Sequence, residues 1–563
     1  MSMMTIAAWH RNRGFVASML FLGTLLVGCN DSDSDGAATD PPPPSTNADL
    51  STLSLSVGML DQAFQTGDLN YTSSQPYTVS SIQVIATAAD AGATIRVDGD
   101  VVASGDASQA VALPEGQTTD ITVLVTAADT TTSKTYTIAV TRESAPAFAQ
   151  RAYIKASNTD PEDRFGYSVA LSGNTLAVGA AEPFDPSIGE SSSATGVDAD
   201  QDDNSAPGAG AVYVFVHDGT TWSQQAYIKA SNTASGDRFG VSVALSGNTL
   251  AVGAPGETSA ATGIGGDQSD NDSPDAGAVY VFTRTGTDWS QQAYLKPSNT
   301  LAFYGGSRFG MSVALSGDTL AAGALGDRSA ATGVNGNDSD TSAPGSGAVF
   351  VFVRNGTDWS QQAYIKASNP GISDQFGWDS ALDGNTLVVG APTEDSAATG
   401  IDGDGNDNSA EFSGAAYVFV RNGTDWSQQA YIKASNASAN SRFGLKVAVS
   451  GDTLAVGVTD RAAVYVFVRN GGTWSEQALI PASAGANGFG ASVAVQGDKL
   501  AVGANGAFNN TTGVSSGTVY LYQRSGTDWV EQAQLNAAIA GQGDGFGTSV
   551  ALSDSWIAIG ATG

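Results

Sequence analysis

Cysteine and histidine are almost absent from this chain of 563 residues, which contains one cysteine and two histidines. A single thiol cannot form an internal disulfide bond. A Ser-His-Asp triad or a histidine-ligated zinc site also has almost no histidine to use. His217 lies where other copies of the same segment have arginine, which makes it a poor general base. The sequence therefore predicts no catalytic residues of these kinds, and only paired carboxylates remain as an alternative.

Basic residues are also scarce. The chain has 24 lysines and arginines against 56 acidic residues, which gives a formal net charge of −32. Such a surface repels phosphate backbones, so nucleic-acid binding is not expected. Two interpretations of the acidity stay open at this point: it keeps the protein soluble in a salty medium, or it supplies ligands for a divalent cation.

The apolar run at 15–26 is too short to span a bilayer as a final anchor, and two arginines precede it, as in an export signal. It ends in Leu-Val-Gly-Cys at 26–29, which resembles the bacterial lipobox, where the signal is cut before the cysteine and the thiol is acylated. The resemblance implies a lipoprotein signal peptide at residues 1–28 and lipidation of Cys29. A plain secretory signal with a chance cysteine is the alternative.

Acylation of Cys29 would hold the protein on a membrane surface. Asn30 follows the cysteine, which resembles outer-membrane sorting, so we expect a lipid-anchored protein of the bacterial cell envelope, at the outer membrane. Residues 29–47 contain several aspartates and a run of prolines at 41–44. This composition predicts a solvated, semi-stiff tether between the anchor and the rest of the chain.

Residues 48–143 alternate apolar and polar side chains, as at Ile121, Val123 and Val125, and period two predicts half-buried strands. Short strands and a hairpin turn at Asp98-Gly99 predict a small β-sandwich. The stretches IATAADAGATI and VLVTAADTTTSKTYTIAVTR resemble the bacterial cadherin-like β-sandwich family. The resemblance implies the fold. The acidic calcium motifs of true cadherins are absent, so no metal site is carried over.

Residues 147–563 repeat a unit of four strand-like stretches, with a Ser-Gly-Asn/Asp-Thr turn between the first two. Four short antiparallel strands in each unit predict the blade of a β-propeller. Phe-Gly pairs open the units at residues 165, 239, 309, 376, 443, 489 and 546. With Gly-Ala-Pro at 253–255 and 390–392, they resemble the FG-GAP repeat of integrin α-subunit propellers and bacterial surface proteins. The fold class expected is therefore all-β: a seven-bladed propeller after a small sandwich.

Two further features concern how the blades pack. One tryptophan recurs in almost every unit, at 222, 289, 359, 426, 474 and 529, and we interpret these as packing residues and not as a sugar platform.

The seventh unit ends before a third strand, while residues 147–157 resemble a fourth strand without a unit of its own. We predict that this segment joins the seventh blade and pairs with residues 546–562. The blade would then still lack one strand, as in a C-terminally truncated sequence.

Acidic residues are concentrated in long insertions between the second and third strands of the first four units, at 181–209, 255–276, 325–346 and 392–413. When the four insertions are aligned, their third, fifth, seventh and eighth positions hold nearly only Asp, Asn, Ser or Gly. The eighth position is always Asp. Alternating oxygen ligands separated by small residues suit calcium. The predicted ligands are Asp198, Asp200, Asp202, Asp203, Asp267, Asp270, Asn337, Asp340, Asp402, Asp404 and Asp407.

These insertions are not the calcium loops of integrins, which lie between Phe-Gly and Gly-Ala-Pro, so no metal residue is carried over from that family. Flexible, solvated loops without a metal are the alternative. Taken together, the sequence predicts a surface lipoprotein that binds or adheres to a protein or glycan through a calcium-stabilised propeller. An envelope polysaccharide hydrolase or lyase that uses paired carboxylates, and a purely structural envelope protein, are the other two interpretations.

Overall fold

The computed structural model describes residues 2–7, 43–76, 79–143, 148, 150–300, 306–509, 514–539 and 541–563. Cys29, the apolar run and most of the expected tether lie outside these residues. The chain divides into two compact units, which are described separately. In the described part of the chain, no helix has the length and apolarity needed to cross a membrane.

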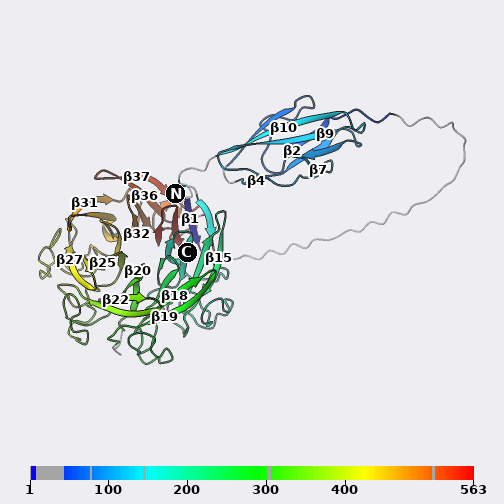
Figure 1. Ribbon diagram of the computed structural model, residues 1–563. Coiled ribbons are helices and arrows are strands. Elements are labelled where there is room, and N and C mark those ends of the chain that lie inside the picture. The colour runs from blue at the N-terminus through cyan, green and yellow to red at the C-terminus, as the bar shows by residue number, and fades with distance from the viewer. Residues whose placement is uncertain are drawn as a thin grey trace. The chain divides into compact units, whose positions relative to one another are not determined.

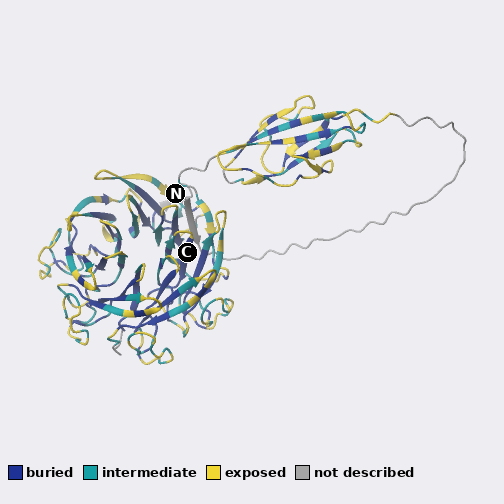
Figure 2. Cartoon of the chain, viewed as in Figure 1, coloured by how far each residue is buried: buried dark blue, intermediate teal, exposed yellow. Residues whose placement is uncertain are grey.

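The smaller unit is a β-sandwich with one apolar core. A five-stranded sheet in the order β3-β10-β9-β6-β7 is complemented by the pairs β2–β5 and β4–β8. The predicted alternation is confirmed, because Ile121, Val123 and Val125 are all fully buried. Buried and exposed positions alternate along the strands of this unit (Figure 2). Its strands are β2 (Leu50–Leu55), β3 (Asn70–Gln75), β4 (Ser81–Ile82), β5 (Val84–Ala88), β6 (Thr94–Val97), β7 (Asp100–Val102), β8 (Val111–Ala112), β9 (Thr118–Thr126) and β10 (Ser133–Arg142).

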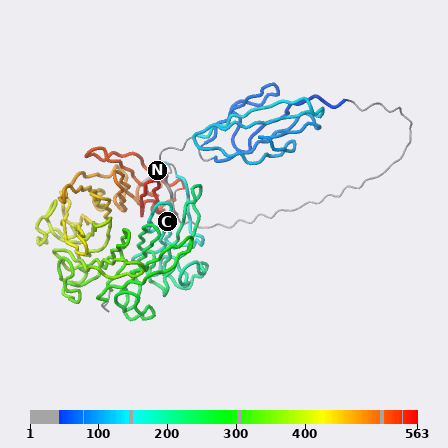
Figure 3. Tube along the Cα trace, in the orientation of Figure 1, coloured from blue at the N-terminus to red at the C-terminus, as the bar shows by residue number. Residues whose placement is uncertain are grey.

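The larger unit is the predicted seven-bladed β-propeller, in which four-stranded sheets follow one another around a ring (Figures 1 and 3). The first three blades are β12 (Phe165–Ser172), β13 (Thr175–Ala180), β14 (Ala211–His217), β15 (Trp222–Ile228); β16 (Ser242–Ser246), β17 (Thr249–Ala254), β18 (Ala278–Thr285), β19 (Asp288–Leu295); β20 (Phe309–Ser316), β21 (Thr319–Ala324), β22 (Ala348–Asn355) and β23 (Asp358–Ile365).

The next three blades have the same antiparallel order. Where the first four blades carry insertions, the fifth has only the short 3-10 helix η1 (Thr459–Arg461), and the sixth has the hairpin β34 (Phe508–Asn509) and β35 (Val514–Ser515). The strands are β24 (Ser380–Asp383), β25 (Thr386–Ala391), β26 (Ala415–Asn422), β27 (Asp425–Ile432); β28 (Lys446–Ser450), β29 (Thr453–Val458), β30 (Ala463–Asn470), β31 (Thr473–Pro481); β32 (Phe489–Gln496), β33 (Lys499–Ala504), β36 (Thr518–Ser525) and β37 (Asp528–Leu535).

The repeated Phe-Gly and Gly-Ala pairs hold neighbouring blades together. Phe239 is buried, and its backbone N–H donates a 2.8 Å hydrogen bond to the carbonyl of Ala209, which precedes the third strand of the first blade. A Cβ atom on Gly253 would lie only 1.9 Å from the carbonyl oxygen of Gly310 in the next blade. Glycine is needed there because the two backbones pass in contact.

The recurring tryptophans join consecutive blades, which confirms their interpretation as packing residues. The indole nitrogen of Trp289 donates a 3.0 Å hydrogen bond to Gln225 of the preceding blade, and the guanidinium of Arg284 lies 5.3 Å from the indole ring. The same arrangement recurs at Trp359, Trp426, Trp474 and Trp529. In the first blade His217 replaces the arginine, and its ring contacts Trp222 and Trp556.

The seventh blade has the sheet order β11-β1-β39-β38. The segment expected to supply its last strand does so as β11 (Gln150–Ile154), so this part of the prediction is confirmed. The expected direct pairing with residues 546–562 is wrong, because β1 (Ser2–Ala7) lies between β11 and β39 (Trp556–Ala561) and runs parallel to both. Antiparallel pairing of β39 with β38 (Val550–Leu552) completes the sheet.

Candidate functional site

The four insertions lie on one face of the propeller. In an antiparallel four-stranded blade, the connection between strands two and three leaves the sheet at the same end as the start of strand one. All four insertions therefore share the face on which the Phe-Gly pairs lie, and their tips carry many of the exposed residues of the ring (Figure 2). This face presents the acidic residues to solvent.

Each insertion folds back onto the last strand of its own blade. Val197 forms a β-bridge with Ile228, and the backbone N–H of Lys229 donates to the carbonyl of Gly196 at 2.8 Å. The equivalent bridges join Ile264 to Leu295, Val334 to Ile365 and Ile401 to Ile432. The bases of the insertions are therefore ordered extensions of the blades.

A buried ion pair lies beneath each insertion. In the first blade the ammonium of Lys229 is 2.8 Å from the carboxylate of Glu190, which also accepts a 2.7 Å hydrogen bond from the hydroxyl of Tyr227. The lysine and glutamate side chains are 0% and 1% exposed. The other three blades have the pairs Lys296–Glu257 at 2.8 Å, Lys366–Asp327 at 3.0 Å and Lys433–Glu394 at 2.5 Å.

Burial lowers the pKa of all four lysines, and the adjacent carboxylate opposes this effect by favouring the ammonium form. Each lysine directly follows the fourth strand of its blade, and each acid lies in the insertion after the second strand. The pair therefore ties the insertion to the end of the fourth strand. Sequence reasoning missed these pairs. The signal was present, since Ala-Tyr-Ile-Lys or Ala-Tyr-Leu-Lys at the end of the fourth strand and an acid after the second strand occur in the same four units.

The predicted calcium ligands at the third aligned position accept hydrogen bonds that stabilise the loop backbone. Asp198 has a positive φ of 54°, and its carboxylate accepts a 2.9 Å hydrogen bond from the backbone N–H of Tyr227. Asp402 bonds Tyr431 in the same way at 2.9 Å. Asn335, at the corresponding place in the third loop, bonds Tyr364. These side chains attach the insertion to the fourth strand.

At the fifth and eighth aligned positions the acids close turns within the insertions. Asp200, Asp267, Asn337 and Asp404 each accept a hydrogen bond from the backbone N–H two residues later, that of Asp202 in the first loop. The aspartate at the eighth position, which is present in all four loops, bonds to the opposite side of its loop. The carboxylates of Asp203, Asp270 and Asp340 accept a hydrogen bond from the backbone N–H ten residues earlier. In the fourth loop the backbone carbonyl of Asp407 accepts the equivalent bond. Bonds from Ser193 lower the pKa of Asp203 to about 2.

These bonds do not bring the predicted ligands together as a cluster of acids. Across the described residues, no group of three or more His, Cys, Asp or Glu side chains is arranged to hold a metal ion. In this structure the carboxylates named above act as acceptors of hydrogen bonds within the loops. Because carbonyl and amide oxygens also bind calcium, the calcium prediction stays a prediction.

The fold and the blade-to-blade contacts define the class of protein: a seven-bladed β-propeller with a separate β-sandwich domain. Comparison with known families agrees with this class. The cadherin-like beta sandwich domain matches residues 50–143. The FG-GAP repeat matches residues 148–215, 222–282, 289–352, 359–419, 426–467, 474–522 and 529–563, so the chain belongs to the FG-GAP repeat family. Domains of both kinds are typically non-catalytic.

A search of curated proteins found no relative. Among solved structures, the chain is similar to one from Bacteroides fragilis NCTC 9343 with a provisional 6-phosphogluconolactonase assignment. The two are 10% identical with a TM-score of 0.37, and the similarity covers 74% of this chain and 90% of that one. A likeness this distant says nothing about activity.

Proposed function

We propose that this protein is a surface-anchored binding or adhesion lipoprotein whose propeller presents four acidic insertions to a protein or glycan partner. FG-GAP repeats and a cadherin-like domain indicate a binding or structural role. Ordered loops on one face of a rigid scaffold support the binding role, because their positions are fixed before a partner arrives.

The observation that carries this proposal is the repeated buried ion pair. Four adjacent blades hold their insertions with a lysine at the same position and a carboxylate that is glutamate in three blades and aspartate in the third, and each lysine side chain is 0% exposed. Removing ions from water is costly, and an apolar pair of similar volume would serve stability equally well. The same buried pair in four blades therefore supports a role in fixing the position of each insertion. The acids at the tips favour a partner with complementary basic groups.

A capture experiment tests the proposal with the full chain. We expect envelope material retained by the immobilised protein to be lost when Asp202 and Asp272 are both changed to Asn, because both are exposed on the insertion face. The matched control changes Asp425 and Asp528, which are exposed on turns between strands three and four, at the opposite face. Equal capture by the two double variants, or no salt-sensitive capture by the unaltered chain, contradicts binding through the insertions.

A further inference from the structure

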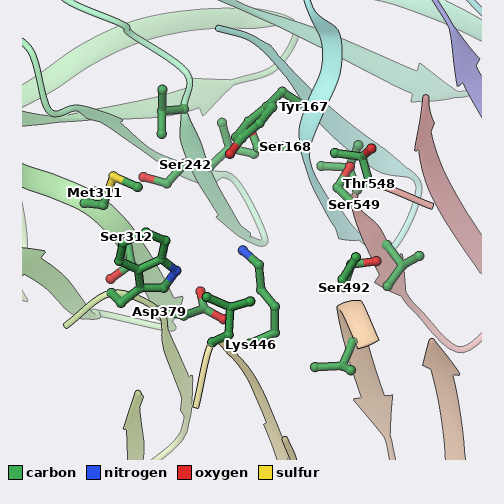
Figure 4. Close-up of a pocket in the computed structure, with 18 of the residues that line it drawn as sticks. Tyr167, Ser168, Ser242, Met311, Ser312, Asp379, Lys446, Ser492, Thr548 and Ser549 are labelled. Carbon is green, nitrogen blue, oxygen red and sulfur yellow. The ribbon is translucent and has the colours of Figure 1, made fainter. Parts of the chain in front are cut away.

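A cavity of about 400 Å³ lies on the axis of the propeller and is lined by all seven blades (Figure 4). Each blade contributes the residues that follow its Phe-Gly pair on the innermost strand, as Tyr167, Ser168 and Val169 do in the first blade. Among the four insertions, only Phe184 of the first lines the cavity, and none of the predicted calcium ligands does.

Five of the seven blades place a serine at the same level of this cavity. Each serine hydroxyl donates to the glycine carbonyl of the next blade at 2.7 to 3.0 Å. Because these protons are already used, the serine oxygens offer only acceptor lone pairs to anything in the cavity. The five residues are Ser168, Ser242, Ser312, Ser492 and Ser549.

The fourth and fifth blades replace this serine with charged residues, Asp379 and Lys446. Asp379 accepts a 2.9 Å hydrogen bond from the backbone N–H of Val447, so it still links two blades. Lys446 makes no hydrogen bond or ion pair with any residue that the structure describes, and Figure 4 shows its ammonium group reaching into the cavity. Burial raises the pKa of Asp379, which Lys446 opposes.

Blade packing does not explain the lysine. A serine at this position satisfies the neighbouring carbonyl in five blades, whereas Lys446 leaves a charge inside the ring without a bonded partner. Lys446 is partly exposed, and its ammonium is a cationic donor that a carboxylate in the cavity can meet. The cavity therefore combines a cationic donor, at Lys446, with a ring of serine acceptors.

Aromatic side chains form one wall at the insertion face. Trp378 lines the cavity from the fourth blade and stacks on Phe184 of the first insertion, with 5.9 Å between centroids and 26° between the ring planes. Blades one and four are not neighbours, so this contact is made across the axis. Tyr167 and Met311 complete an apolar rim with Trp378.

We propose that this axial cavity binds a small polyhydroxylated acid of sugar-acid size. Its carboxylate lies against the ammonium of Lys446, its hydroxyl groups donate to the serine oxygens, and the apolar face of its ring packs on Trp378. The volume lies within the range of small-molecule sites, and a few convergent polar groups on an apolar wall are typical of them.

The test is calorimetric titration of the full chain with D-glucuronate, with D-glucose and acetate as probes that lack the carboxylate or the hydroxyls. We expect glucuronate to bind and to lose at least about tenfold in affinity in Lys446→Ser, which restores the residue of the other blades and should keep the ring folded. D-glucose and acetate should each bind at least about tenfold more weakly than glucuronate. Lys499→Ser, on β33 outside the cavity lining, should bind as the unaltered chain does.

A second measurement locates the site. Glucuronate should change tryptophan fluorescence in the unaltered chain, and this change should be smaller in Trp378→Phe. Absence of binding heat at about 10 mM glucuronate would overturn the proposal. So would unchanged affinity in Lys446→Ser, or equal affinity for glucuronate and glucose.

Discussion

The buried lysine–acid pairs are the residue-scale feature that most distinguishes the first four blades. Lys229 and Glu190 are separated by 39 positions in the sequence, yet both are almost fully enclosed in the structure. Their mutual attraction offsets the loss of hydration only while both partners remain. The pair is therefore more informative about loop position than about net stability.

Lys229→Met should lower the free energy of unfolding by about 3–5 kcal/mol, because it leaves the carboxylate of Glu190 buried without its cation. Chemical denaturation of the full chain measures this loss. The double variant Lys229→Met/Glu190→Gln should recover part of it, since no uncompensated charge remains. An equal loss in Lys499→Met, whose side chain is outside the four pairs, would show that the effect is not specific.

Three buried aspartates predict how stability depends on pH. Burial raises the pKa of Asp163, Asp237 and Asp374 to about 7, so folding favours their protonated forms. Their contribution to the free energy of unfolding is fully present below about pH 4 and is lost as the pH rises through about 7. Each should cost up to about 2 kcal/mol of stability between pH 5 and pH 7.

The triple variant Asp163→Asn/Asp237→Asn/Asp374→Asn should lose less stability than the unaltered chain over that range. An amide oxygen can still accept the backbone N–H that each carboxylate accepts. Melting temperatures at pH 5 and pH 8 measure the difference. Asp528→Asn controls for the removal of an exposed negative charge, and parallel pH curves for the triple variant and the unaltered chain would refute the assignment.

At the scale of elements, the insertion is a loop fixed at its base by backbone pairing and by one side-chain bond. Asp402 has a φ of 56° and bonds the N–H of Tyr431 on β27. Gly265 occupies the same aligned position in the second insertion with a φ of 67°. The position therefore requires left-handed backbone, and the carboxylate adds a hydrogen bond.

Asp402→Ala should destabilise the fold by about 1 kcal/mol more than Asp402→Gly. Both substitutions remove the bond to Tyr431, but only alanine also strains the left-handed backbone. Thermal unfolding of the two variants gives the comparison directly. If alanine is tolerated as well as glycine, the backbone geometry described for this loop is incorrect.

Calcium binding is a separate prediction for the same elements. Binding to the folded state alone would stabilise the protein by about 2.7 kcal/mol per site at a hundredfold excess over Kd. Chelator should reverse the shift in Tm, and the loop that holds Asn337 and Asp340 should be weakest because it has the fewest carboxylates. Calorimetry that records no heat at millimolar calcium, with melting unaffected by chelator, would assign these acids to loop hydrogen bonds alone.

At the scale of the whole molecule, the two ends of the propeller chain meet in one blade. Ser549 of the seventh blade donates to the carbonyl of Gly166 in the first at 2.8 Å, and Trp556 contacts His217. β11, from the start of the larger unit, shares the sheet with β39. Ring closure therefore depends on contacts between residues nearly 400 positions apart in the sequence.

Cys29→Ser tests the proposed anchor of the molecule. We expect the variant to leave the membrane fraction or to retain its leader, because the acylated thiol is gone. Fractionation and the mass of the intact chain measure both outcomes. A variant that stays membrane-bound and is normally processed contradicts lipidation at Cys29. Processing before this residue also removes β1, so the mature seventh blade would keep β11, β38 and β39.

The sequence by itself determined the number of blades, the sandwich and the packing role of the tryptophans. Strand alternation, Ser-Gly-Asn/Asp turns and the repeated Phe-Gly pairs are local patterns, and local backbone preferences act over a few residues. The separate positions of the four acidic insertions also followed from the repeat. Residues that recur at one aligned position of the repeat occupy the same position in each blade.

Only the tertiary structure decided what the recurring residues contact. It placed Asp198 against a backbone N–H, buried Lys229 on Glu190, put β1 between β11 and β39, and brought Asp379 and Lys446 into one cavity. The partners in these contacts lie in different strands or blades. Their distance and burial depend on closure of the ring, which no local sequence pattern specifies.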